Sequence, residues 1–167
     1  MFLFSCFTGL AIADMERLKF SHIQTAADGR RYIRKERQKT KVESVVPLHP
    51  IAEAILSRNQ EGQALKEEGE GLVFPRGCSR SMMNNKLSTV GKACGIRQRL
   101  SFHMARHTFG TLSLSAGIPI ESIAKMMGHA SIASTQIYAQ VTDNKISEDM
   151  DRLIRKYQKE KTKEEAI

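Results

Sequence analysis

Side chains that could bind a phosphate or transfer a proton gather in one stretch of 36 residues. His103, Arg106 and His107 are spaced i, i+3 and i+4, so on a helix they would share one face. His129 and Tyr138 follow in the same stretch. Arginine offers paired hydrogen bonds to phosphate oxygens, histidine moves protons near neutral pH, and the tyrosine hydroxyl is a nucleophile once cationic neighbours or a base activate it. These residue types could together bind a phosphate and transfer a proton, although a tyrosine taken alone is more often a core residue with a satisfied hydroxyl.

Metal ions often assist such chemistry, but no pair of carboxylates lies near this cluster. We therefore expect no metal and no other cofactor, with Arg106 as the main phosphate ligand and His103 and His129 as further donors or proton carriers. One preorganised donor contributes about 3–4 kcal/mol in a transition state. His103 and His107 also imitate a zinc-protease helix, but Met104 stands where the general base would be, so we set zinc hydrolysis aside. We expect His107 to be structural.

The order and gaps of these residues resemble a known family. His-x-x-Arg, then Gly-His 22 and 23 residues after the arginine, then a tyrosine nine residues after that histidine, resemble the tyrosine recombinases, the phage-integrase group. The run FTGLAIAD, residues 7–14, looks like the opening of their catalytic domain. Lys39, seven residues before Val46, stands where the family has a lysine on a β-hairpin. The resemblance covers about residues 4–157.

The resemblance implies a fold and a mechanism. The fold would be an α+β catalytic core, mainly helical, with a small three-stranded antiparallel sheet. Tyr138 would form a 3′-phosphotyrosyl link, Lys39 would protonate the leaving 5′-oxygen, and rejoining would need no ATP. The family normally has an arginine where this chain has Ala11, a variant that looks like Bacteroides-type integrases of mobile elements. We expect Arg37 to replace it, because residues i and i+2 of a strand point the same way and Arg37 would enter the site beside Lys39.

Basic residues are concentrated in two regions of a chain with net charge +8. No Asp or Glu lies between Gly71 and Ile120, and residues 30–41 hold seven basic residues against one Glu. A surface laid against phosphates would avoid carboxylates in this way, so double-stranded DNA is the expected partner. By resemblance, four protomers would act on two DNA sites, and the isolated domain could be a monomer. The expected DNA-binding residues are Arg76, Arg80, Lys86, Arg97, Arg99 and Lys41.

Periodicity and turn signals divide the chain into short elements. Residues 59–71 are expected to form an exposed loop, and the charged tail from Lys159 is expected to fray. We predict strands at 19–25, 31–37 and 42–48, with Asp28-Gly29 as the first hairpin turn. We predict helices at 3–8, 12–18, 51–58, 79–93, 101–117, 119–128, from 131 through Tyr138, and 143–157.

The helix carrying Arg106 has two further features. Phe102, Ala105, Phe109 and Leu112 form an apolar stripe that would hold it to a core. Gly110 falls on the polar face, where a mid-helix glycine costs about 1 kcal/mol relative to alanine. Something close to the backbone is therefore expected to need that space.

Residues 1–158 are predicted to be one catalytic domain, followed by a charged tail at 159–167. Family members usually carry an N-terminal DNA-clamping domain ahead of this point, so we expect the chain to be a fragment. The odd count of three cysteines and the absence of a basic region or cleavage site in residues 1–13 predict a cytoplasmic protein without a membrane segment.

Two other interpretations remain open. Residues 117–141 also resemble a helix-turn-helix, which would make the chain a DNA-binding regulator without catalytic activity. An inactive remnant that still binds DNA would fit Ala11. A nicked or suicide DNA substrate separates these cases, because an active enzyme leaves an SDS-resistant protein–DNA adduct.

Overall fold

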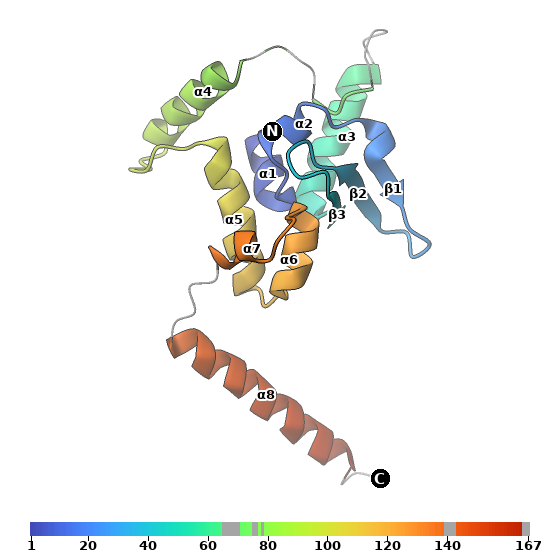
Figure 1. Ribbon diagram of the computed structural model, residues 1–167, viewed down its shortest axis with the longest axis vertical. Coiled ribbons are helices and arrows are strands. Elements are labelled where there is room, and N and C mark those ends of the chain that lie inside the picture. The colour runs from blue at the N-terminus through green and yellow to red at the C-terminus, as the bar shows by residue number, and fades with distance from the viewer. Residues whose placement is uncertain (65–70, 75–76, 78, 139–142, 165–167) are drawn as a thin grey trace.

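A computed structural model of the chain describes residues 1–64, 71–74, 77, 79–138 and 143–164, with the backbone alone for 62–64, 143–145, 148, 156 and 159–164. The three strands follow one another in the chain and form one small sheet, and most of the other described elements are helices (Figure 1). The elements are α1 (Phe2–Thr8), α2 (Ile12–Met15), the 3-10 helix η1 (Phe20–His22), β1 (Ile23–Thr25), β2 (Arg31–Glu36), β3 (Glu43–Pro47), α3 (Pro50–Ala64), α4 (Arg80–Ala93), α5 (Phe102–Ser115), α6 (Ile120–Met127), α7 (Ala133–Gln136) and α8 (Asp143–Glu164).

The three strands form an antiparallel sheet in the order β1-β2-β3. Ile33 at its centre pairs with Ile23 on one side and with Val46 on the other. The predicted first hairpin is confirmed: Gly29 adopts φ 80, and the backbone N–H of Ala26 donates to the carbonyl of Arg30 at 2.8 Å. The mainly helical α+β fold with a three-stranded antiparallel sheet is therefore as the sequence predicted.

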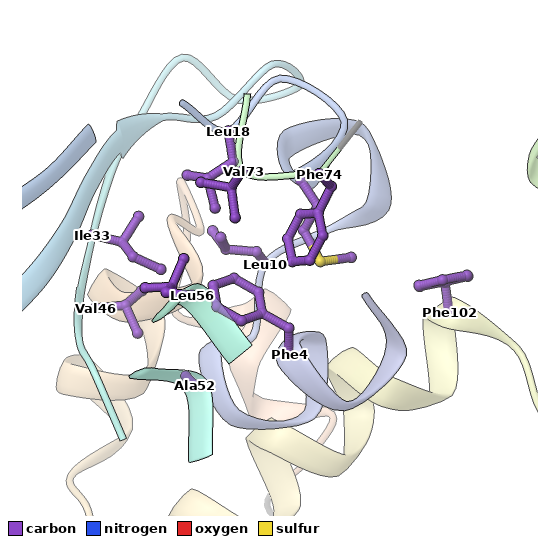
Figure 2. Packing of buried hydrophobic residues seen from close by; sticks show 11 residues of the cluster. Phe4, Leu10, Leu18, Ile33, Val46, Ala52, Leu56, Val73, Phe74 and Phe102 are labelled. Atoms are coloured by element: carbon purple, nitrogen blue, oxygen red, sulfur yellow. The ribbon is translucent and has the colours of Figure 1, made fainter. Parts of the chain in front are cut away.

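The main core lies between the sheet, α1 and α3. Figure 2 shows Phe4, Leu10 and Leu56 meeting Ile33 and Val46 from the sheet, whereas Phe102 lies to one side of this group. A second cluster joins α5 and α6 to the segment after α7, through Phe109, Ile123, Met127 and Tyr138. The expected nucleophile is therefore part of a hydrophobic core.

Capping residues set the ends of the helices that carry the site. The hydroxyl of Ser101 accepts a hydrogen bond from the N–H of Met104 at 3.4 Å and begins α5, as predicted. Gly9 and Gly128 end α1 and α6 with φ 66 and 59, the left-handed conformation that glycine adopts without strain.

Five predicted boundaries were wrong. Helix α3 continues to Ala64, because Gln60, Glu61 and Gln63 are good helix formers and outweigh one glycine. Helix α8 continues to Glu164 rather than fraying at residue 159. The second predicted helix ends at Met15, and the first predicted strand begins only at Ile23 after the turn of η1. Helix α7 ends at Gln136, so Tyr138 lies in a turn beyond it.

The predicted stripe on α5 was wrong in one position. Leu112 is 54% exposed, whereas Gly110 and Ser113 are buried. The buried face of α5 passes from Ala105 through Phe109 to Ser113, at the i, i+4 spacing of one helix face. This face meets both α1 and α6.

None of the described helices is both long enough and apolar enough to cross a lipid bilayer.

Removal of the Phe4 side chain should test the main core. Phe4 is 0% exposed, and truncation of a buried phenylalanine typically costs about 3–5 kcal/mol. We expect Phe4→Ala to lower the free energy of unfolding by that amount in urea titrations. Leu3→Ala is the matched control, because Leu3 is 60% exposed on the same helix and its loss should change stability by about 0.5 kcal/mol or less. Equal effects of the two substitutions would contradict this core.

Candidate active site

Two arginines meet at the carboxyl end of α6. Arg106 donates from Nη2 to the carbonyl of Met127 at 2.7 Å, and Arg37 donates from Nη1 to the carbonyl of Gly128 at 3.3 Å. Arg106 also donates from Nη1 to the carbonyl of Gly9, where α1 ends. The last carbonyls of a helix lack partners within the helix and carry the negative end of its dipole, so they attract cations. Helix α6 thus brings together two guanidinium groups that are 69 residues apart in the sequence.

The two arginines raise the local electrostatic potential. Burial, and then the nearby charge of Arg37, lower the pKa of Arg106 to about 10. Arg106 nevertheless remains protonated at neutral pH. Both side chains are largely withdrawn from water, and a buried cation is stabilised when an anion reaches it. This arrangement suits an incoming phosphate.

Asp14 in α2 fixes the position of Arg37. Its Oδ2 accepts from Nε of Arg37 at 3.3 Å, and its Oδ1 accepts from the backbone N–H of Gln38 at 2.9 Å. Asp14 is 2% exposed, so this ion pair is protected from solvent. Asp14 belongs to the FTGLAIAD run, but its role was not predicted from the sequence, because its partners come close only in the folded chain.

His129 follows directly after the end of α6. Its Nδ1 lies 2.7 Å from the hydroxyl of Thr135, and Thr135 is buried. Burial, followed by the charges of Arg106 and Arg37, lowers the pKa of His129 to about 4. The imidazole is therefore neutral at physiological pH, and Thr135 holds one of its two nitrogens.

Tyr138 packs directly on Gly110 of α5. A Cβ atom at Gly110 would lie 2.8 Å from Cγ and Cδ2 of the tyrosine ring, which confirms that a close neighbour needs this space. Burial raises the pKa of the Tyr138 hydroxyl, whereas the charges of Arg106 and Arg37 oppose that rise. The net shift is upward, so burial outweighs the two cations in this structure.

His107 lies between His103 and Tyr138. Its Nε2 is 2.7 Å from Nε2 of His103, and its ring meets that of Tyr138 edge to face, with centroids 5.0 Å apart. At the first distance one imidazole donates and the other accepts, so the pair shares a proton. Burial, His103 and Arg106 lower the pKa of His107. The i, i+4 spacing of His103 and His107 is visible in the sequence, whereas the contact between His107 and Tyr138 appears only in the folded chain.

Lys39 does not lie in a strand. Strand β2 ends at Glu36, because Asp14 binds the N–H of Gln38 and the N–H of Lys41 donates to the carbonyl of Arg37 at 3.1 Å, which closes a turn. Arg37 and Lys39 were predicted to point the same way as residues i and i+2 of a strand, and this was wrong. Arg37 is buried, and Lys39 is exposed in the turn.

The predicted DNA-binding residues have different surroundings. Arg80 forms a double ion pair with Glu16, at 3.0 and 2.6 Å, and Nζ of Lys41 lies 3.8 Å from Oε1 of Glu36. Lys86, Arg97 and Arg99 are exposed, and Arg76 lies outside the described residues.

The chain belongs to the phage integrase family, whose sequence model matches residues 1–145. It is 30% identical over 146 residues to tyrosine recombinase XerD of Halalkalibacterium halodurans, covering 83% of this chain and 48% of that protein. It is 29% identical over 150 residues to tyrosine recombinase XerC of Oceanobacillus iheyensis, covering 84% and 48% respectively. The chain thus spans about half the length of these relatives.

Solved structures share the fold. The XerA recombinase superposes with a TM-score of 0.71 at 24% identity, over 88% of this chain and 54% of that one. XerH site-specific recombinase bound to difH substrate gives 0.70 at 20% identity, over 89% and 45%. The Tn1549 transposon integrase in complex with transposon right end DNA gives 0.66 at 17% identity, over 92% and 57%.

Gly110→Ala should reverse the usual effect of alanine in a helix. Alanine in place of a mid-helix glycine ordinarily stabilises by about 1 kcal/mol. Here the methyl group would overlap the Tyr138 ring, so we expect a loss of about 1–3 kcal/mol in urea titrations. Ser115→Ala, at an exposed position of α5, is the control. The loss should disappear in a Tyr138→Ala background, and its persistence there would contradict the contact.

His129 should remain neutral in mildly acidic solution. Its pKa is about 4 in the folded protein, against about 6.5 in the unfolded chain. Between these values the unfolded state binds more protons, so stability falls as the pH falls through this window and is unaffected above it. His129→Gln should remove this part of the pH dependence. NMR titration should find the ring unprotonated at about pH 5; titration near the ordinary value would contradict the assigned environment.

Proposed function

We propose that this chain is the catalytic domain of a site-specific DNA recombinase that cleaves and rejoins strands through Tyr138 without a metal ion. One observation carries the proposal: two buried arginines are anchored on the same helix end, and the charges of both act on Tyr138. A DNA-binding regulator would not need two buried cations whose charges act on a tyrosine hydroxyl. Family membership supports the same choice.

The reaction would be a transesterification at phosphorus. The Tyr138 oxygen attacks, its proton passes to solvent or to a neutral histidine, and the bond from phosphorus to the 5′-oxygen breaks. Lys39 gives a proton to that oxygen, which leaves as a hydroxyl, and the phosphate stays on the tyrosine. Attack by a 5′-hydroxyl reverses these transfers and rejoins DNA. Arg106 and Arg37 stabilise the charge on the non-bridging oxygens.

Arg37 would replace the arginine that the family normally has at the position of Ala11. Two observations support this role of Arg37. It donates to the carbonyl of Gly128, next to the Met127 carbonyl that accepts from Arg106. Its charge also affects the pKa values of Arg106, His129 and Tyr138. The backbone turn at Lys39 does not weaken this role, because Asp14 and Gly128 orient Arg37 independently of Lys39.

Double-stranded DNA would be the substrate, and integration or excision of a mobile element would be the biological reaction. The structural likeness to the Tn1549 transposon integrase supports the latter. Four protomers would form the synapse, with α8 docked on a neighbouring protomer. In support, α8 exposes a row of apolar side chains: Ile146, Met150, Leu153, Ile154 and Tyr157.

Tyr138→Phe should abolish the covalent intermediate. A suicide substrate labelled on the 3′-phosphate side should give an SDS-resistant adduct with the wild-type chain and none with the variant. EDTA should leave the wild-type yield unchanged. The ring is retained, so stability should change by no more than about 1 kcal/mol. Undiminished adduct in the variant would refute the proposal, and mass spectrometry of the adduct would identify the residue that carries DNA.

Arg37→Ala should slow adduct formation by about 100- to 1,000-fold, the usual effect of removing one transition-state donor. Arg34→Ala is the matched control, because Arg34 is an exposed arginine of β2, 3.7 Å from Glu43. We expect less than about a threefold effect there. Thermal melting should accompany both measurements, since Arg37 also pairs with Asp14. A wild-type rate for a folded Arg37→Ala protein would assign the missing role to another arginine.

A further inference from the structure

The turn that carries Lys39 is anchored on both sides. Before it, the N–H of Gln38 donates to Asp14 Oδ1 at 2.9 Å. After it, the hydroxyl of Thr40 donates to the carbonyl of Gly128 at 2.9 Å. Lys39 itself is exposed between these two contacts.

The contact made by Thr40 joins the turn to the centre of the site. Gly128 also accepts from Arg37 and immediately precedes His129. Thr40 thus ties the backbone beside Lys39 to the helix end that positions two other site residues. Without Thr40, the turn would keep its closing bonds, from the N–H of Arg37 to the carbonyl of Val42 at 3.0 Å and from the N–H of Lys41 to the carbonyl of Arg37 at 3.1 Å, but it would lose its hydrogen bond to α6 on the far side of Lys39.

The Thr40 bond is not needed to satisfy the end of α6. The carbonyl of Gly128 keeps its partner Arg37 when the threonine hydroxyl is removed, so no buried acceptor is left without a hydrogen bond. What the bond does is fix the position of the turn relative to the end of α6. A general acid acts only within hydrogen-bond reach of its target, and a lysine side chain is long and flexible. Fixing its backbone reduces the volume that its amino group explores.

We propose that Thr40 is a positioning residue for Lys39, which holds the lysine turn against α6 so that the amino group meets the leaving 5′-oxygen. This inference rests on the proposed function of Lys39 as the general acid. It assigns to Thr40 no contact with DNA.

Changing the leaving group tests this role directly. Two suicide substrates are compared, one with the natural 5′-oxygen at the scissile phosphate and one with sulfur in its place. A thiol has a pKa of about 8.5, so a thiolate leaves without receiving a proton. We expect Thr40→Val to slow cleavage of the oxygen substrate by about 10- to 100-fold and that of the sulfur substrate by less than about threefold. Lys39→Ala should give the same pattern.

Two variants serve as controls. Thr40→Ser keeps the hydroxyl and should restore cleavage of the oxygen substrate. Ser44→Ala removes a different donor from the same helix end, the hydroxyl that bonds to the Met126 carbonyl. Any loss caused by Ser44→Ala should be equal for the two substrates. If Thr40→Val lost its cooperative melting transition, Thr40→Ala would replace it.

Equal slowing of both substrates by Thr40→Val, or no slowing of either, would overturn the proposal for Thr40. A wild-type chain without adduct on either substrate would instead refute the proposed function. Hydrogen exchange tests the positioning itself without any activity: Thr40→Val should speed exchange of the Lys41 amide, which closes the turn, by about tenfold. Unchanged protection of that amide would also overturn the proposal.

Discussion

The carboxyl end of α6 is the point on which the site depends. Three successive carbonyls there accept bonds from distant side chains: Met126 from Ser44, Met127 from Arg106, and Gly128 from Arg37 and Thr40. Gly128 is needed for two reasons. Its φ of 59 ends the helix, and a Cβ atom in its place would lie 2.6 Å from Cδ of Arg37. A substitution there would disturb both the helix end and the arginine bound to it.

This helix end allows like charges to be neighbours in a largely buried site. The carbonyl dipoles and Asp14 offset part of the repulsion between Arg106 and Arg37. Burial, and then the remaining positive potential, lower the pKa of His129 and keep it neutral, and the same potential opposes the rise in the pKa of Tyr138. An anion such as phosphate would be stabilised there, because it would compensate both cations.

The proposed nucleophile is also part of the folded core. Tyr138 belongs to the apolar cluster that joins α5 to α6, and it lies where only a glycine at position 110 leaves room for its ring. Its hydroxyl is therefore positioned by core packing, which tolerates few alternative arrangements. The His107 ring meets the Tyr138 ring edge to face, and its Nε2 lies 2.7 Å from Nε2 of His103.

The sequence by itself determined the helices of the site, the shared face of His103 and Arg106, and the need for space at Gly110, because these follow from the local period of 3.6 residues per turn. Only the tertiary structure decided that Arg37 pairs with Asp14 and Gly128, 23 and 91 residues away. The same contacts take the chain out of β2 and leave Lys39 in a turn. Hydrogen bonds between distant segments override local strand preference, and no periodicity in the sequence encodes which carbonyl a buried arginine will find.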